Sequence, residues 1–128
     1  MNILFSFISI VCGVVPLSQI SKDEVWIVLF SADWCGPCQK VKPKFALAAE
    51  RMKSIIRFGR VDCVADLELC MEYNVVGMPT ILALGGTLGY EVVPFSGNRE
   101  EEDLVNFANS IAHTYFSRPS RTVSASLP

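Results

Sequence analysis

The stretch Trp34-Cys35-Gly36-Pro37-Cys38 sets two cysteines two residues apart, between two apolar segments of different pattern. The segment before it, Val25 to Phe30, is continuously apolar without alternation, which predicts a central strand covered on both faces. The segment after it, Val41 to Met52, has apolar residues at three- and four-residue spacing, which predicts an amphipathic helix. Cys35 would then stand at a helix N-terminus, where unpaired N–H groups and the helix dipole favour a thiolate over a thiol.

Two thiols at this spacing lie about one helical turn apart and can close a small disulfide ring. We therefore expect a redox pair for thiol–disulfide exchange, with Cys35 as the attacking nucleophile and Cys38 as the resolving thiol. The alternative is a zinc site completed by Cys63 and Cys70. Because six residues separate Cys63 from Cys70, a wide gap for a zinc knuckle, the redox pair is favoured. No metal and no organic cofactor are required.

The remaining patterns predict an α/β fold with the element order β-α-β-α-β-β-α. The last two strands are separated by a glycine-rich stretch, which indicates an antiparallel hairpin. The expected sheet is therefore mixed, with a parallel crossover and this hairpin, and helices lie on both of its faces. The final helix should start after Asn98, the expected N-cap, with Glu101 at capping-box spacing. The expected strands cover 25–30, 55–62, 80–84 and 90–95, and the middle helix covers 66–73.

The two ends of the chain differ from this domain, which we expect to span 21–116. Ile3 to Val15 is a run of mostly apolar residues that precedes the first charged side chain. It is too short for a membrane span of about 20 residues. It favours a signal peptide that comprises residues 1–20, with Val11 and Gly13 as the best residues for positions −3 and −1 of a cleavage site. A buried first strand or an uncleaved anchor are the alternatives. Residues 117–128 predict a disordered tail.

Cysteine content and charge limit the environment and the partners. Removal of a signal peptide would leave four of the five cysteines, an even number that suits an oxidising compartment. We therefore expect the secretory pathway, either the endoplasmic reticulum lumen or secretion, with the cytoplasm as the alternative. The net charge of −2 and the scattered basic residues exclude a nucleic-acid-binding surface. A chain of 128 residues suits one domain, expected to be a monomer.

From about Val25 to His113 the sequence resembles the thioredoxin superfamily, and within it the catalytic domains of protein disulfide isomerases. The Trp34–Cys38 stretch matches the thioredoxin active-site motif, and Pro43 falls where that family has a kinking proline. Gly77-Met78-Pro79-Thr80 resembles the loop whose proline is cis and faces the motif. The resemblance implies the thioredoxin fold, protein substrates with disulfides or thiols, and a redox partner protein or glutathione.

Features outside the motif resemble the disulfide isomerase branch. The resemblance implies a structural disulfide between Cys63 and Cys70; two buried free thiols are the alternative. It also implies that Arg99, in Phe95-Ser96-Gly97-Asn98-Arg99, approaches the active site and lowers the pKa of Cys38.

Several residues are expected to support the reactive thiols. Trp34 should pack beside them and shape an apolar surface. Met78 and Pro79 should form one wall of a groove in which an extended peptide pairs with the backbone. Gly36 and Pro37 are the thioredoxin-type middle pair, which the resemblance associates with a more reducing couple than that of the isomerases.

One departure from the resemblance concerns the second thiol. Leu29 stands where both families usually keep a buried acid that accepts the proton of the second cysteine, and Arg60 replaces the lysine partner of that acid. Without the acid, resolution by Cys38 could be slow. The second hypothesis is therefore a redox-weak, chaperone-type module that binds peptides in the Met78–Pro79 groove.

Overall fold

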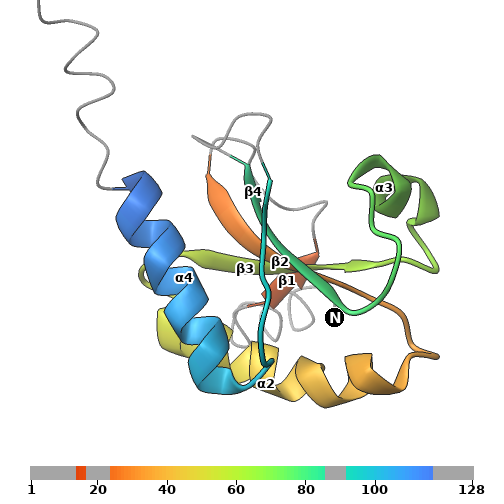
Figure 1. Cartoon of the computed structure of the whole chain (residues 1–128), viewed down its shortest axis with the longest axis horizontal. Helices are drawn as coiled ribbons and strands as arrows, with labels where there is room; N and C mark the ends of the chain where they lie inside the picture. Colours follow the sequence, from red (N-terminus) through yellow and green to blue (C-terminus); the bar gives the residue numbers. More distant parts are fainter. Residues whose placement is uncertain (1–13, 17–23, 86–91, 117–128) are drawn as a thin grey trace, which may run out of the picture.

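A five-stranded mixed sheet forms the centre of the computed structural model, which describes residues 14–16, 24–85 and 92–116 (Figure 1). The strand order is β1-β3-β2-β4-β5. β1 and β2 run parallel to β3, whereas β4 is antiparallel to both β2 and β5. The strands are β1 (Val14–Pro16), β2 (Val25–Ser31), β3 (Arg57–Asp62), β4 (Thr80–Gly85) and β5 (Val93–Pro94).

Helices cover both faces of this sheet. α2 (Gly36–Met52) and α4 (Glu101–Phe116) pack together on one face, and the short helix α3 (Leu67–Glu72) lies on the other (Figure 1). This three-layer arrangement confirms the predicted α/β fold with a mixed sheet between helices. Among the described residues, no helix is long and apolar enough to cross a membrane.

β2 supplies side chains to two separate cores. Val25, Ile27 and Leu29 pack with residues of α2 and α4. Trp26, Val28 and Phe30 point to the other face and pack with residues near α3. All seven residues of β2 are buried, which confirms the prediction of a central strand covered on both sides. The end of this strand is therefore firmly held where it leads into the cysteine motif.

The sheet contains a strand that the expected element order lacks. Val14–Pro16 form β1 and pair with residues 58–60 of β3 at the edge of the sheet. The sheet thus extends upstream of residue 21, where we expected the domain to start. A three-residue edge strand is too short for a periodic pattern, so its pairing is decided by the neighbouring strand rather than by its own sequence. Residues 1–13 and 117–128 lie outside the described residues.

Two other boundaries differ from the expected ones. β5 is only Val93–Pro94, within the expected strand 90–95, whose first two residues lie outside the described part. Pro94 has no N–H for the ladder, which is tolerated because β5 is an edge strand. α4 begins at Glu101, so the expected cap Asn98 is wrong. The Glu100 N–H instead donates a hydrogen bond to Asp103 Oδ2 at 3.3 Å, which is the side-chain half of a capping box that starts at Glu100.

Ion pairs join α2 to the start of α4. Lys44 Nζ lies 2.8 Å from Glu100 Oε2, and the Arg51 guanidinium lies 3.0 Å from Glu101 and 3.1 Å from Glu102. The hydrogen bonds from Arg51 lower the pKa of Glu102. These groups are largely exposed, so the pairs orient the two helices more than they stabilise the fold.

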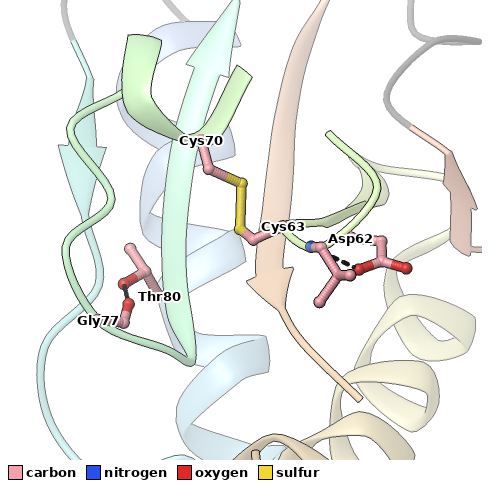
Figure 2. Close-up of a disulfide and its surroundings, with 6 residues drawn as sticks. Asp62, Cys63, Cys70, Gly77 and Thr80 are labelled. Carbon is pink, nitrogen blue, oxygen red and sulfur yellow. Dashed lines mark hydrogen bonds between the residues drawn. A yellow bond between two sulfur atoms is a disulfide. The ribbon is translucent and has the colours of Figure 1, made fainter. Parts of the chain in front are cut away.

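A disulfide between Cys63 and Cys70 fastens α3 to the end of β3 (Figure 2). This is the pairing that the resemblance implies, and both residues are buried. The Cys63 N–H also donates to the Ser31 carbonyl at 2.8 Å, which ties the same point to the end of β2. Because their sulfurs are bonded to each other, Cys63 and Cys70 are not available as ligands for a four-cysteine zinc site.

We predict that the Cys63→Ala/Cys70→Ala variant has a free energy of unfolding about 2–3 kcal/mol lower than that of the wild type, because the disulfide restricts the unfolded chain. Urea unfolding without reductant measures the difference. The Cys35→Ala/Cys38→Ala variant is the control, since it removes two thiols but no structural bond. Equal urea midpoints for the wild type and Cys63→Ala/Cys70→Ala would contradict the stabilising role.

Candidate active site

The reactive pair is built around the first turn of α2. Cys35 is the N-cap of this helix, with extended backbone angles of φ −90° and ψ 114°. Its Sγ accepts a hydrogen bond from the Cys38 N–H at 3.2 Å, and its carbonyl accepts one from the Gln39 N–H at 3.2 Å. The Cys35 N–H donates to the Ala32 carbonyl at 3.1 Å. The predicted position of Cys35 at a helix N-terminus is thus realised, and a negative charge on its sulfur would face a helix N–H.

Burial distinguishes the two thiols. Both are free, but Cys35 retains 5% exposure whereas Cys38 has none. They share a small apolar cluster with Ala32, against which Met78 packs. A substrate can therefore reach only the Cys35 sulfur directly, which fits the expected division between an attacking and a resolving thiol.

The loop before β4 faces Cys35. The Met78–Pro79 peptide bond is cis, and the Cys35 thiol donates to the Met78 carbonyl at 3.5 Å. Thr80 Oγ1 donates to the Gly77 carbonyl at 2.5 Å, which closes the loop on itself (Figure 2). Pro79 is buried and Met78 is half-buried. Of the two residues expected to line a groove, Met78 therefore lies against the Cys35 thiol.

The surroundings of Cys38 favour its protonated form. Burial raises the pKa of the Cys38 thiol, and its hydrogen bond with Cys35 raises this pKa further. Leu29 supplies no proton acceptor, because its side chain is a hydrocarbon; it is 2% exposed within the apolar core. Arg60, its register neighbour on β3, is exposed. Resolution by Cys38 thus requires the loss of a proton from a site where the usual acid is absent.

A lysine that the sequence analysis did not name acts on the Cys38 thiol. Arg99 is exposed and makes no hydrogen bond or ion pair within the described part of the chain, so its role stays a prediction. The positive charge of Lys42 lowers the pKa of Cys38, although less than burial raises it. Lys42 follows Cys38 by four residues and pairs with Asp33, Nζ to Oδ1 3.3 Å. Residues four apart on a helix are neighbours, so this spacing could have identified Lys42 from the sequence as a residue close to Cys38.

The remaining motif residues form the outer surface of the site. Trp34 is 72% exposed, so it presents a large apolar ring beside the thiols instead of packing into the core. Gly36 and Pro37 are also exposed. Pro37 lies in the first turn of α2, where its missing N–H would have no helical partner in any case.

Residues 17–110 match the thioredoxin family, and the chain belongs to that family. It is 38% identical over 94 residues to protein disulfide-isomerase TMX3 of Xenopus laevis, covering 71% of this chain and 20% of the relative. It is 41% identical over 88 residues to protein disulfide isomerase-like 2-3 of Oryza sativa subsp. japonica, covering 69% and 20%. The chain therefore spans about a fifth of the length of these relatives.

Solved structures agree with the fold. The J-Trx1 fragment of ERdj5 superposes with a TM-score of 0.72 at 25% identity, covering 79% of this chain and 52% of that one. The first thioredoxin domain of mouse protein disulfide-isomerase A4 superposes with a TM-score of 0.64 at 23% identity, covering 80% and 71%.

We predict that Leu29→Asp accelerates ring closure by Cys38 about 100-fold at neutral pH, because a buried carboxylate can accept the Cys38 proton. Only the Cys38 thiolate can attack Cys35, and the pKa of Cys38 is raised in the wild type, so the rate of ring closure should keep increasing at pH values above the ordinary pKa of a thiol. In Leu29→Asp, this increase in rate should occur at lower pH. The measurement is single-turnover release of substrate from a preformed mixed disulfide across a pH series.

The control is Leu29→Asn, which buries a polar group of the same shape but accepts no proton. Both variants should lose about 3–5 kcal/mol of stability through lost apolar burial and a buried polar group. If Leu29→Asn accelerates closure as much as Leu29→Asp, proton acceptance is not the limiting factor.

Proposed function

We propose that this protein is a thiol–disulfide oxidoreductase that acts on disulfides of protein substrates. The observation that carries the proposal is the position of the Cys35 sulfur. It caps α2, accepts the Cys38 N–H at 3.2 Å, and contacts the Met78 carbonyl of the opposite loop at 3.5 Å. A thiolate there is stabilised by the helix and is next to a backbone that can align a peptide.

The reaction transfers two electrons from the protein to the substrate. The Cys35 thiolate attacks one sulfur of a substrate disulfide, forming a mixed disulfide as the substrate S–S bond breaks and a substrate thiolate leaves. Cys38 then loses its proton and attacks the Cys35 sulfur, which releases the second substrate thiol and leaves a Cys35–Cys38 disulfide. The two substrate sulfurs are reduced as the two cysteines are oxidised, and the reverse sequence oxidises a dithiol.

Side chains around the thiols supply substrate alignment. Met78 and Pro79 form one wall of the groove, and the exposed ring of Trp34 offers apolar contact beside it. Arg99 supports the second step by approaching Cys38 when substrate is bound. A redox partner protein or glutathione returns the pair to its starting state.

A peptide-binding module with weak redox activity is the second candidate function. Leu29 favours it, because the buried apolar side chain leaves Cys38 without a carboxylate to take its proton. The groove could then hold unfolded segments even if exchange were slow.

We place the protein in the secretory pathway, in the endoplasmic reticulum lumen or outside the cell. The disulfide between Cys63 and Cys70 supports this, because such bonds persist in oxidising compartments. In this proposal residues 1–13 act as a signal peptide, a shorter segment than the expected 1–20 because Val14–Pro16 belong to the sheet, and the protein is a monomer.

We predict that Cys35→Ser abolishes the reduction of insulin disulfides by dithiothreitol above the uncatalysed rate, since the hydroxyl cannot form the mixed disulfide. Turbidity of the released insulin B chain measures the reaction. Cys38→Ala is the companion variant: it keeps the nucleophile but not the resolving thiol, so a long-lived mixed disulfide should appear on non-reducing gels. A wild type no faster than Cys35→Ser would favour the peptide-binding module.

We predict that the mature secreted chain begins at Val14, because cleavage after Gly13 removes most of the apolar run yet keeps β1 whole. N-terminal sequencing of the protein recovered from a secreting host measures this. An intact Met1 on secreted protein, or a chain that begins after Pro16, would contradict the predicted site.

A further inference from the structure

We propose that the outer side of α3 is a docking surface for substrate segments that are both cationic and apolar. This surface, here called the α3 face, consists of Val64, Asp66, Leu67, Glu68, Met71 and Glu72. The inference rests on the proposed function, which requires protein substrates, and adds the chemical class of segment that this chain selects. It concerns a part of the molecule beyond the Met78–Pro79 groove.

The α3 face exposes apolar side chains on a fold that buries most others. Val64 is 61% exposed, Leu67 60% and Met71 65%. Leu67 and Met71 are four residues apart on α3, so they lie on the same side of the helix. Apolar side chains gathered on one helix side, without a partner element over them, are typical of interaction surfaces.

The carboxylates of the α3 face lack counter-charges. From residue 61 to residue 98 the sequence contains no lysine or arginine. The ion pairs of the described residues all involve acids elsewhere, on α2, at the start of α4 or beside β2 and the cysteine motif. The side chains of Asp66, Glu68 and Glu72 have no partner within the described part of the chain. Cations of a bound segment would supply the missing partners.

Four residues of the α3 face also border a hollow, whose size favours a peptide side chain over a small ion. It has a volume of about 420 Å³ and is lined by Ala65, Asp66, Leu67, Glu68, Leu69 and Glu72. Among the described residues, no three acidic, histidine or cysteine side chains converge to hold a metal ion. Three carboxylates and three apolar side chains around one hollow suit a lysine or arginine side chain, whose methylene stem packs on apolar surface while its charge reaches an acid.

The α3 face is held in a fixed relation to the thiols. The disulfide between Cys63 and Cys70 fastens α3 to the sheet, and the Cys63 N–H bonds to the end of β2, just before the motif. On its other side, the Val75 N–H donates to the Cys70 carbonyl at 2.9 Å, and the chain then runs through the fully exposed Val76 to Met78. A segment docked on α3 can thus continue toward Cys35 along this loop.

Fluorescence anisotropy with a labelled, cysteine-free peptide of Leu, Lys, Gly and Ser tests the inference, against a twin peptide with Glu in place of each Lys. The lysine peptide should bind more tightly than its twin, and added salt should reduce the difference. In the full chain, Leu67→Ser/Met71→Ser should raise Kd for the lysine peptide about tenfold through lost apolar burial. Glu68→Gln/Glu72→Gln should raise it about fivefold and abolish the preference for lysine.

The matched control is Leu47→Ser/Ile55→Ser, which removes two apolar side chains of similar exposure, 54% and 49%, from a distant surface. Its Kd should stay within about twofold of the wild type. Equal binding of both peptides, or an unchanged Kd in Glu68→Gln/Glu72→Gln, overturns the proposal. Glu68→Gln/Glu72→Gln keeps the side-chain shapes, so it still tests the proposal if Leu67→Ser/Met71→Ser does not fold.

Two further outcomes separate the competing explanations. If the wild type forms a dimer by light scattering and Leu67→Ser/Met71→Ser is monomeric, a second copy occupies the α3 face and the proposal is wrong. Because the peptides lack cysteine, binding is independent of exchange. Charge-selective binding without insulin reduction would refute only the proposed function, whereas insulin reduction without charge-selective binding would refute only the docking surface.

Discussion

The hydrogen bond from the Cys38 N–H to the Cys35 sulfur joins the fold to its chemistry. The first turn of a helix needs acceptors for its free N–H groups, and a side-chain oxygen of Ser, Thr, Asp or Asn usually provides one. Here the acceptor is the sulfur of Cys35, the proposed nucleophile. A thiolate accepts such a bond better than a thiol, so the start of α2 is stabilised by the same charge that makes Cys35 reactive. This arrangement depends on β2, whose burial on both faces fixes where α2 begins.

The parts of the fold that could be predicted are those in which a pattern extends over many residues. The apolar run of β2 and the stripe of α2 had enough length to define both type and place, and the motif between them located the site. β1 and β5 could not be predicted fully, because two or three residues carry no periodicity and their pairing depends on distant strands. The cap of α4 was misplaced for a related reason: Asn98 is a better cap by propensity, but Glu100 is the residue whose N–H Asp103 reaches.

Charge pairing was the least predictable property of the molecule. The sequence shows that no basic residue lies between Arg60 and Arg99, but not which acids that leaves unpaired. In the structure, α2 and α4 are joined by pairs that involve Lys44 and Arg51, whereas the acids of α3 form no ion pair with any described cation. Charged side chains therefore differ between the two faces of the sheet. On one face they form ion pairs that orient α2 and α4, whereas on the other the unpaired acids of α3 produce a negative electrostatic field. An unbalanced field acts at a distance and favours cationic partners before contact.

Leu29 affects both the stability of the fold and the expected rate of ring closure by Cys38, in opposite directions. Full burial of a leucine side chain contributes about 1.5–3 kcal/mol, and an unpaired polar group at the same depth would reverse that sign. Leu29 packs in the core that joins β2 to α2 and α4, so it strengthens the frame that holds Cys35 in place. However, a leucine at this position cannot accept the proton of Cys38, and burial raises the pKa of that thiol, so Cys38 stays protonated. The first exchange step, which needs only Cys35, is therefore better supported than the second. If Cys35 is the nucleophile, we expect slow closure by Cys38 to lengthen the lifetime of the mixed disulfide with the substrate, so that the proposed oxidoreductase would also retain its substrates.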